Sequence, residues 1–185
     1  IDAGLLAQAG DKLKLIANYG AGVDHIDVAT ARQRGILVSN TPGVVTEDTA
    51  DMVLALILAV TRRIPEGLQL MQSGTWTGWS PMALLGGRLG GRRLGILGMG
   101  RIGKEVAKRA RAFDMNVRGF DRYWDEVFAK DCTVERCSTA DDALKDVDVI
   151  SLHMNLDDSN RHFINKARIA TMKKGAILIN TARGG

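Results

Sequence analysis

The sequence predicts an α/β protein built on a doubly wound parallel sheet. From residue 93 onward, short apolar runs alternate with segments whose apolar residues recur at helical spacing, and this alternation is typical of a parallel sheet with helices on both faces. A glycine-rich turn within ILGMGRIG, residues 96–103, joins one apolar run to the helix that follows it. With 185 residues, 45% of them apolar, the chain can bury a core in one or two domains.

The first part of the chain predicts a small αβ unit followed by two helices. Apolar spacing and turn residues indicate, in order, a strand in KLKLIA, a helix over about 26–33, a strand in ILVSN, a long helix over 47–61, and a second helix to about 72. Asp24 and Asp27 are candidate cap or first-turn residues of the helix over about 26–33. Thr46 is a candidate cap of the long helix. Ile64-Pro65 is expected to end it, because proline lacks an N–H and disfavours a helical residue before it.

The second part of the chain predicts the alternating elements of the sheet. They are strands over 93–97, 116–120, 133–135, 147–152 and 175–180, and helices over 101–113, 139–145 and 165–172. Residues 73–92 precede them and predict a glycine-rich loop. We expect Trp76 and Trp79 in this loop to pack as an arm against a neighbouring domain or subunit, since no basic groove for nucleic acid surrounds them.

The glycine-rich turn is compatible with two kinds of phosphate site. Gly98, Gly100 and Gly103 fit the dinucleotide pattern G-x-G-x-x-G, and Gly98 to Lys104 also fits all but the last position of the triphosphate pattern G-x-x-x-x-G-K-[ST]. The triphosphate site needs a serine or threonine after the lysine to bind Mg²⁺, and Glu105 occupies that position. The dinucleotide interpretation is therefore favoured.

Each residue of the dinucleotide pattern has its own physical role. Gly98 permits a tight turn, Gly100 lets the backbone approach the pyrophosphate, and Gly103 lets the helix lie close to the strand. The pyrophosphate would then meet the N–H groups and the positive dipole end of the helix. Asp121, which ends the next apolar run, can accept hydrogen bonds from the adenosine ribose. It would repel a 2′-phosphate, so we predict NAD over NADP, although the adjacent Arg122 could serve a phosphate.

The composition argues against several other classes of protein. The net charge is only +4 and the basic residues are spread along the chain, so nucleic acid is not indicated as a partner. The most apolar run, residues 52–60, is too short to cross a membrane. Cys132 and Cys137 lack zinc-site spacing, so we expect no metal and a reduced, cytoplasmic protein. The chain begins at Ile1, so a targeting signal is neither seen nor excluded.

Taken together, the motifs resemble the D-isomer-specific 2-hydroxyacid dehydrogenases. The resemblance covers almost the whole chain from about residue 11 and rests on NYGAGVDHID, RGILVSNTPG, LGILGMGRIG, SLH and KKGAILINTARGG. It implies a Rossmann-like NAD domain at 65–185, a crossing helix at 46–64, and the end of a flavodoxin-like substrate domain at 1–45. It also implies a homodimer formed through the nucleotide domain, and hydride transfer between NAD and a small 2-oxo acid such as glyoxylate, hydroxypyruvate or a phosphoglycerate.

The resemblance assigns roles to individual residues. Arg183 would bind the carboxylate and carbonyl of the substrate, and a planar guanidinium at the carboxyl end of a strand suits that contact. His153 would orient the loop near the nicotinamide and is not the acid/base histidine of the family. The remaining positions are a substrate-carboxylate loop of Tyr19, Gly20, Ala21 and Gly22, a pair over the pyrophosphate, Arg101 and Ile102, and the cofactor-lining Met154, Thr181 and Ala182.

The sequence also departs from the family pattern. The acid/base histidine and its supporting glutamate come from motifs beyond R-G-G, and the sequence ends at Gly185, so we expect the chain as given to bind cofactor without turnover. His25 and His162 match neither residue. Asp114 replaces a usual glycine at a helix end, at a cost of about 1 kcal/mol, and Asn155 replaces a usual proline.

Two rival functions are compatible with part of this pattern. The family includes transcriptional corepressors, so a non-catalytic NAD-sensing protein is one alternative. A dinucleotide-like domain of an unrelated enzyme, such as a methyltransferase with an adenosine cofactor, is the other. Asp121 suits that enzyme as well, but Arg183 and the N-Y-G-A-G loop do not.

Overall fold

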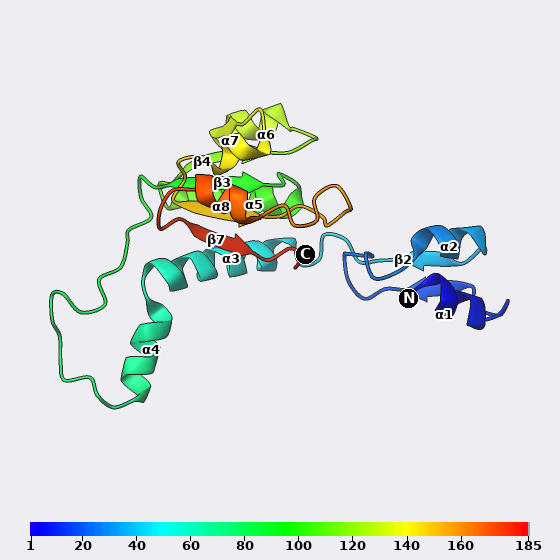
Figure 1. Cartoon of the computed structure of the whole chain (residues 1–185), viewed down its shortest axis with the longest axis horizontal. Coiled ribbons are helices and arrows are strands. Elements are labelled where there is room, and N and C mark those ends of the chain that lie inside the picture. The colour runs from blue at the N-terminus through cyan, green and yellow to red at the C-terminus, as the bar shows by residue number, and fades with distance from the viewer. Residues whose placement is uncertain (185) are drawn as a thin grey trace. The chain divides into compact units, whose positions relative to one another are not determined.

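The computed structural model describes residues 1–184 (Figure 1). The chain divides into two compact units, of which the first is Ile1–Thr46 and the second begins at Glu47. The first unit contains α1 (Ala3–Gln8), β1 (Leu15–Ala17), α2 (Val28–Gln33) and β2 (Leu37–Ser39). Its two strands pair in parallel, and a small core of Leu6, Ala31 and Ile36 lies beneath its helices. The two strands and α2 agree with the sequence prediction.

The second unit is built on a five-stranded sheet. Its strands are β3 (Arg93–Leu97), β4 (Asn116–Phe120), β5 (Val134–Arg136), β6 (Val149–Leu152) and β7 (Ile177–Asn180). Every pairing is parallel, and the order across the sheet is β5-β4-β3-β6-β7. The chain therefore starts at the centre, moves outward through β4 and β5, and returns to the other side of β3. This topology confirms the predicted doubly wound sheet, with its switch point between β3 and β6.

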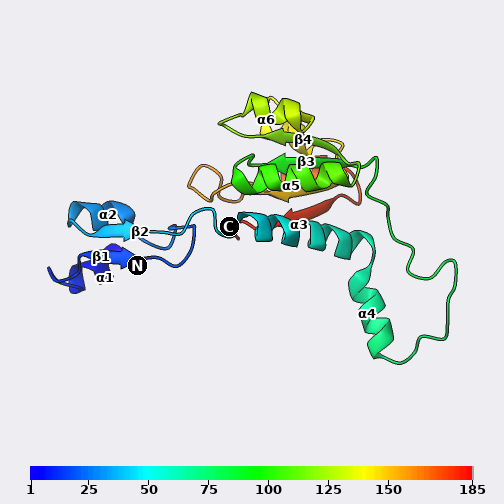
Figure 2. The ribbon, with the colours of Figure 1, turned by 180° about the vertical axis from the view of Figure 1, so that it is seen from behind.

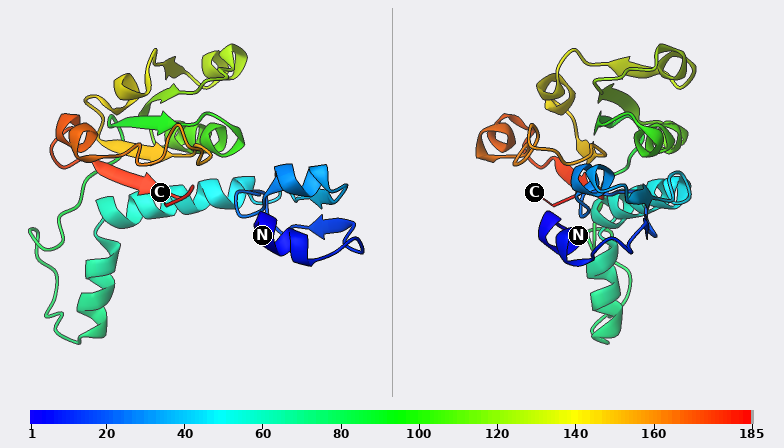
Figure 3. Two further views of the ribbon diagram at one scale, coloured as in Figure 1. Left: turned by 45° about the vertical axis from the view of Figure 1, so that its right-hand side comes forward. Right: turned by 90° about the vertical axis from the view of Figure 1, so that its right-hand side faces the viewer.

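Helices cover both faces of this sheet. One face carries α3 (Thr46–Thr61), α5 (Arg101–Ala112) and α6 (Glu126–Asp131), and the other carries α7 (Ala140–Leu144) and α8 (Lys166–Thr171), as the right-hand view of Figure 3 shows. The strand residues alternate accordingly, because Leu94 and Ile96 join the core under α3 and α5 whereas Leu97 joins the core under α7. Seen from behind, α5 lies over β3 (Figure 2).

The segment between α3 and the sheet leaves apolar side chains exposed. The long helix ends at Thr61 as predicted, and Pro65 lies in the first turn of α4 (Ile64–Gln72), where a missing N–H costs no helical hydrogen bond. Pro65 therefore both follows the end of α3 and belongs to the first turn of α4. Residues 73–92 form a loop without helix or strand, in which Trp76 and Trp79 are 53% and 84% exposed.

Two short helices were not predicted from the sequence. They are α1 and α6, each only six residues long and each begun by an aspartate side chain, Asp2 and Asp125, that accepts a backbone N–H three residues on. Elsewhere the predicted bounds differ from the observed ones by at most three residues, the largest difference being the start of β1 at Leu15. Thr46 is the first residue of α3 rather than a residue before it. Asp114 has a φ of 57°, so it does occupy the left-handed position that the sequence indicated.

Candidate dinucleotide-binding site

The predicted site residues follow the ends of four neighbouring strands. Leu97 is the register partner of both Phe120 and Leu152, and Leu152 is the partner of Asn180. The next residues along the chain therefore form adjacent turns at the carboxyl edge of the sheet: Gly98, Asp121, His153 and Thr181. Backbone hydrogen bonds tie these turns together, because Gly98 N donates to Phe120 O at 2.9 Å and His153 N donates to Leu97 O at 2.7 Å.

The three glycines of the turn differ in what surrounds them. Gly98 has a φ of 93°, and a side chain there would come within 2.6 Å of the His153 backbone. A Cβ on Gly103 would lie 2.0 Å from the carbonyl oxygen of Gly98, so only glycine lets α5 approach β3 this closely. A Cβ on Gly100 would meet no atom within 4 Å. The turn and the helix are therefore packed tightly, while the face at Gly100 is open to a ligand.

The start of α5 completes this turn. Gly100 precedes the helix with extended backbone and, having no side chain, makes no capping hydrogen bond, so the first N–H groups of the helix are not capped from this position. Arg101 begins the helix and is exposed, whereas Ile102 is partly buried against the core under α3 and α5. The two residues expected over the pyrophosphate thus differ, since one reaches solvent and the other anchors the helix.

Asp121 is held by the backbone of the turns beside it. One carboxylate oxygen accepts Met99 N at 2.7 Å and the other accepts Tyr123 N at 2.8 Å. Each oxygen has a second lone pair that can accept another hydrogen bond. The sequence indicated a contact to a ribose but not this second role, in which the carboxylate links the glycine turn after β3 to the turn after β4.

His153 is a largely buried histidine, with a small part of its surface still exposed, and it has a single side-chain partner in the described part of the chain. Its Nε2 lies 2.8 Å from the hydroxyl of Ser151, which is completely buried. Burial lowers the pKa of His153 to about 4, because the charged imidazolium loses its hydration. His153 is therefore neutral at physiological pH and braces the turn after β6 against the glycine turn.

A cavity of about 240 Å³ opens beside β6 and β7. Three residues that the sequence predicted to line a site are in its wall, namely Met154, Ala182 and Arg183. The other residues of the wall were not predicted from the sequence to line a site: Leu152, Asn155, Leu156, Asn160, Phe163, Ile164, Leu178 and Asn180. Their position directly after β6 and along β7 was the available signal, since ligands of such sheets bind at these strand ends.

The turn after β7 presents polar groups at this cavity. Asn180 organises the turn, because its side chain accepts Ala182 N at 3.0 Å and donates to Arg183 O at 2.9 Å. The Thr181 hydroxyl is buried and has no hydrogen-bond partner among the described residues. A buried hydroxyl without a partner is costly in a finished site, so its environment fits the polar group of a bound cofactor.

The loop Tyr19–Gly22 lies in the first unit, and three of its four carbonyl groups already accept hydrogen bonds from side chains. The side-chain amide of Asn18 donates to Gly20 O at 2.9 Å and to Gly22 O at 3.0 Å, and Asn40 donates to Ala21 O at 2.7 Å. His25 fixes the Asn18 amide through a 3.1 Å contact to its oxygen. Tyr19 is fully exposed. The N–H of Gly20 is also engaged, since it donates to Asn18 O at 3.1 Å, so an anion could use only the other N–H groups of the loop.

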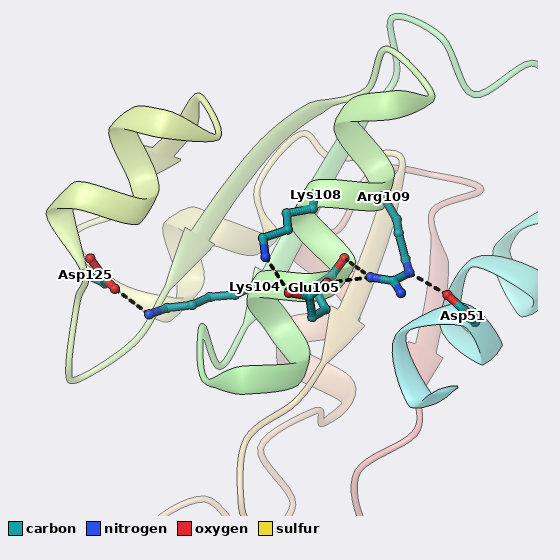
Figure 4. A network of polar contacts seen from close by, with 6 residues as sticks. All are labelled: Asp51, Lys104, Glu105, Lys108, Arg109 and Asp125. Carbon is teal, nitrogen blue, oxygen red and sulfur yellow. Dashed lines mark hydrogen bonds and ion pairs between the residues drawn. The ribbon is translucent and has the colours of Figure 1, made fainter. Parts of the chain in front are cut away.

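Ion pairs hold α5 against its neighbours (Figure 4). Arg109 contacts Asp51 of α3 at 2.5 Å and Glu105 at 2.7 Å, and the bonds from Lys108 and Arg109 lower the pKa of Glu105. Lys104 pairs with Asp125 at 2.5 Å. In a triphosphate site this lysine would face the turn, so its pairing with Asp125 agrees with the dinucleotide interpretation.

The described part of the chain contains no cluster of three or more histidine, cysteine or acidic residues that could hold a metal ion. No helix in this part of the chain is both long enough and apolar enough to span a membrane.

The doubly wound sheet, the glycine turn and the acidic residue after the next strand together define a Rossmann-type dinucleotide-binding domain. A family model described as "D-isomer specific 2-hydroxyacid dehydrogenase, NAD binding domain" matches residues 54–185. The chain therefore belongs to the D-isomer specific 2-hydroxyacid dehydrogenase family, as its motifs indicated.

Individual relatives agree with this family. A glyoxylate reductase of Aeropyrum pernix is 45% identical over 188 residues, covering 100% of this chain and 56% of the relative. A hydroxypyruvate reductase of Thermotoga maritima is 43% identical over 180 residues, covering 97% and 56%. The crystal structure of an Aquifex aeolicus D-lactate dehydrogenase complexed with NAD and lactic acid superposes with a TM-score of 0.90 at 36% identity, covering 100% and 54%. The chain thus spans about half the length of the relatives that it matches.

The burial of His153 predicts a pH dependence of stability. An unfolded histidine takes up a proton below its ordinary pKa of 6.5, whereas folded His153 does so only near 4. The free energy of unfolding should therefore fall as the pH drops from 6.5 to 4, by about 3 kcal/mol from this residue. Urea unfolding at about pH 7 and about pH 4.5 should show this loss in the wild type and a smaller loss in His153→Gln.

The matched control is His162→Gln, because His162 is an exposed histidine in the same unit. This variant should keep the wild-type dependence on pH. An equal acid-induced loss in the wild type and in His153→Gln would show that His153 is not the group responsible.

Proposed function

We propose that this chain is the cofactor-binding part of an NAD-dependent oxidoreductase that transfers a hydride between NAD(H) and a small 2-hydroxy or 2-oxo acid. The observation that carries the proposal is the carboxyl edge of the sheet, where the closely packed Gly98–Gly103 turn and the fixed Asp121 carboxylate adjoin. The names of the glyoxylate and hydroxypyruvate reductases and of the D-lactate dehydrogenase support the substrate class.

Different residues of the carboxyl edge would bind different parts of the cofactor. The open face at Gly100 and the start of α5 suit the pyrophosphate, with Arg101 and Ile102 beside it. Asp121 suits the adenosine ribose. The nicotinamide half of the cofactor would lie at the cavity beside β6 and β7. There it would meet Met154 and Ala182, the Thr181 hydroxyl, which has no partner among the described residues, and the turn braced by His153. When bound, NAD supplies the hydride acceptor or donor, and the protein supplies position and charge.

Arg183 is the proposed substrate-binding and catalytic cation. It lies in the cavity wall after β7 and is exposed, so its guanidinium is accessible to an anionic substrate. A fixed cation beside a carbonyl oxygen stabilises the negative charge that develops there during reduction. A guanidinium is a poor proton donor, because it stays protonated far above neutral pH, so the proton of the product alcohol must come from another group. The Tyr19–Gly22 loop of the first unit is proposed, by itself, as a loop that binds a carboxylate.

We further propose that the protein forms a homodimer through α3, α4 and the loop that follows. Helix α4 has no buried residue, and its Ile64, Leu68 and Met71 are each more than half exposed. Trp76 and Trp79 continue this apolar surface along the chain. A monomer rarely leaves such a surface uncovered, and closed two-fold pairing is the commonest way to cover it.

The two cysteines support a cytoplasmic location. Cys132 and Cys137 are both free, and Cys137 is buried. Burial raises the pKa of the Cys137 thiol, which keeps it in its unreactive protonated form. Unpaired cysteines are usual in proteins of reducing compartments.

The proposed role of Asp121 predicts the choice of cofactor. Wild-type protein should bind NADH more tightly than NADPH in a fluorescence titration, because the carboxylate attracts the ribose hydroxyls and repels a 2′-phosphate. Asp121→Asn keeps the shape and removes the charge, so its preference for NADH should fall about tenfold. Asp131→Ala, an exposed acid of α6, is the control and should change neither affinity. A wild type that prefers NADPH would contradict the assignment.

The proposed role of Arg183 predicts a selective loss of catalysis in the full-length enzyme. Arg183→Ala should lower kcat/KM for the oxo acid by roughly 10²-fold or more while the dissociation constant for NADH changes little. Arg183→Lys should recover only part of this loss, since one ammonium cannot reproduce two parallel hydrogen bonds. Steady-state kinetics and NADH titration of the same preparations measure both effects. An Arg183→Ala enzyme of wild-type efficiency would place the chemistry elsewhere.

The proposed interface predicts a change of mass in solution. The full-length protein should sediment as a dimer at micromolar concentration, and Leu68→Glu should shift it toward the monomer because the charge would be buried on association. Val127→Glu is the matched control, since Val127 of α6 is 72% exposed and lies outside the proposed interface. A monomeric wild type in the ultracentrifuge would contradict the proposal.

A further inference from the structure

Arg122 forms a link between two loops at the carboxyl edge of the sheet. It follows Asp121 after β4, and its guanidinium donates to the hydroxyl of Ser159 at 2.7 Å and lies 3.7 Å from a carboxylate oxygen of Asp157. Both partners are on the loop after β6, drawn in orange in Figure 1. Because β4 and β6 flank β3 in the sheet, this link joins the loops on the two sides of the Gly98 turn.

The loop after β6 is organised to receive this arginine. One carboxylate oxygen of Asp157 accepts the backbone N–H of Ser159 at 2.8 Å and also accepts its hydroxyl, so the hydroxyl oxygen is left to accept from Arg122. Asn160 closes the loop by accepting Asp157 N at 2.9 Å and donating to Asn155 O at 2.6 Å. The hydrogen bonds from Ser159, with the charge of Arg122, lower the pKa of Asp157. The arginine is thus matched by an ionised carboxylate.

This pairing decides which charge a cofactor would meet beside Asp121. The nearest basic neighbour in sequence is Arg122, and it is balanced by Asp157. Lys104, the next basic residue beyond Arg101 in α5, is balanced by Asp125. A phosphate on the adenosine ribose would therefore meet the Asp121 carboxylate, while the adjacent guanidinium is directed toward the other loop.

We propose that Asp157 and Ser159 determine the preference for NAD over NADP by holding the Arg122 guanidinium on the loop after β6, away from a ribose 2′-phosphate. The inference rests on the proposed function, since it concerns the same cofactor. Asp121 supplies the repulsion, and the Asp157–Ser159 pair removes the cation that would offset it. The chemical group that the pair discriminates against is a phosphate monoester on the adenosine ribose.

The link can be broken without unfolding the protein. The side chains of Arg122 and Asp157 are 64% and 50% exposed, and exposed ion pairs contribute little to stability. Asp157→Asn keeps an oxygen that can accept the N–H of Ser159, so the turn of the loop is retained, and Ser159→Ala removes the hydroxyl that Arg122 contacts. The double variant Asp157→Asn/Ser159→Ala therefore frees the guanidinium at little cost to the fold.

The test compares dissociation constants for NADH and NADPH. In fluorescence titrations of the whole chain, the double variant should bind NADPH about fivefold more tightly than the wild type, with NADH affinity within about twofold. Adding Arg122→Ala to the double variant should abolish the gain, because the gain depends on the freed guanidinium. The unfolding midpoint of each variant should stay close to that of the wild type.

A matched control separates this effect from a general change of surface charge. Arg136 pairs with Glu126 at 2.6 Å, and both side chains are more than half exposed. Glu126→Gln frees an arginine in the same way and should leave both dissociation constants unchanged. A gain in NADPH affinity that survives Arg122→Ala, or that Glu126→Gln reproduces, would overturn the inference, as would an unchanged NADPH affinity in the double variant. A wild type that binds neither nucleotide would overturn the proposed cofactor site together with it.

Discussion

The close approach of α5 to β3 is the contact on which the rest of the site depends. It is possible only because Gly103 has no side chain, since a Cβ there would lie 2.0 Å from the Gly98 carbonyl. This approach places the start of the helix at the centre of the carboxyl edge, between β4 and β6. The ion pairs from Arg109 to Asp51 and from Lys104 to Asp125 then hold the helix to α3 and to the segment before α6.

Glycines within β3 and β4 also allow close packing on both faces of the sheet. A Cβ on Gly95 of β3 would lie 2.1 Å from the carbonyl oxygen of Ala143, so α7 packs directly on the backbone of the central strand. On β4, the side chain of Met99 covers Gly119, where a Cβ would meet its sulfur at 2.9 Å. The backbone N–H of Met99 is in turn bound by Asp121. The glycine turn is thus fixed to β4 twice, by the packing of Met99 on Gly119 and by the Asp121 carboxylate that follows the strand.

Local patterns predicted the sheet, whereas contacts between distant segments escaped sequence reasoning. The apolar runs of β3, β4 and β6 and the helical spacing of α5 are repeated signals, so their existence and order were predictable. Helices α1 and α6 were not predicted although α2 and α8, with six residues each, are equally short, so the apolar period of so few residues is not a dependable signal. The side-chain partners of His153 and Arg122 could not be predicted. Ser151 becomes the partner of His153 only when the turn after β6 is buried, and Ser159 lies 37 residues from Arg122 in the sequence. The role of Arg183 rests on family resemblance and remains a prediction.

The order of the strands also arranges charge along the proposed cofactor site. From β4 to β7, the edge presents the Asp121 carboxylate, the glycine turn, the neutral His153 and the Arg183 guanidinium. An ionised histidine in the third position would attract the pyrophosphate away from the helix start, and burial prevents this ionisation. Under the proposed function, the negative end then receives the uncharged ribose hydroxyls and the positive end receives the anionic oxo acid. The direction proposed for the dinucleotide thus follows from the order in which a doubly wound sheet places its strands.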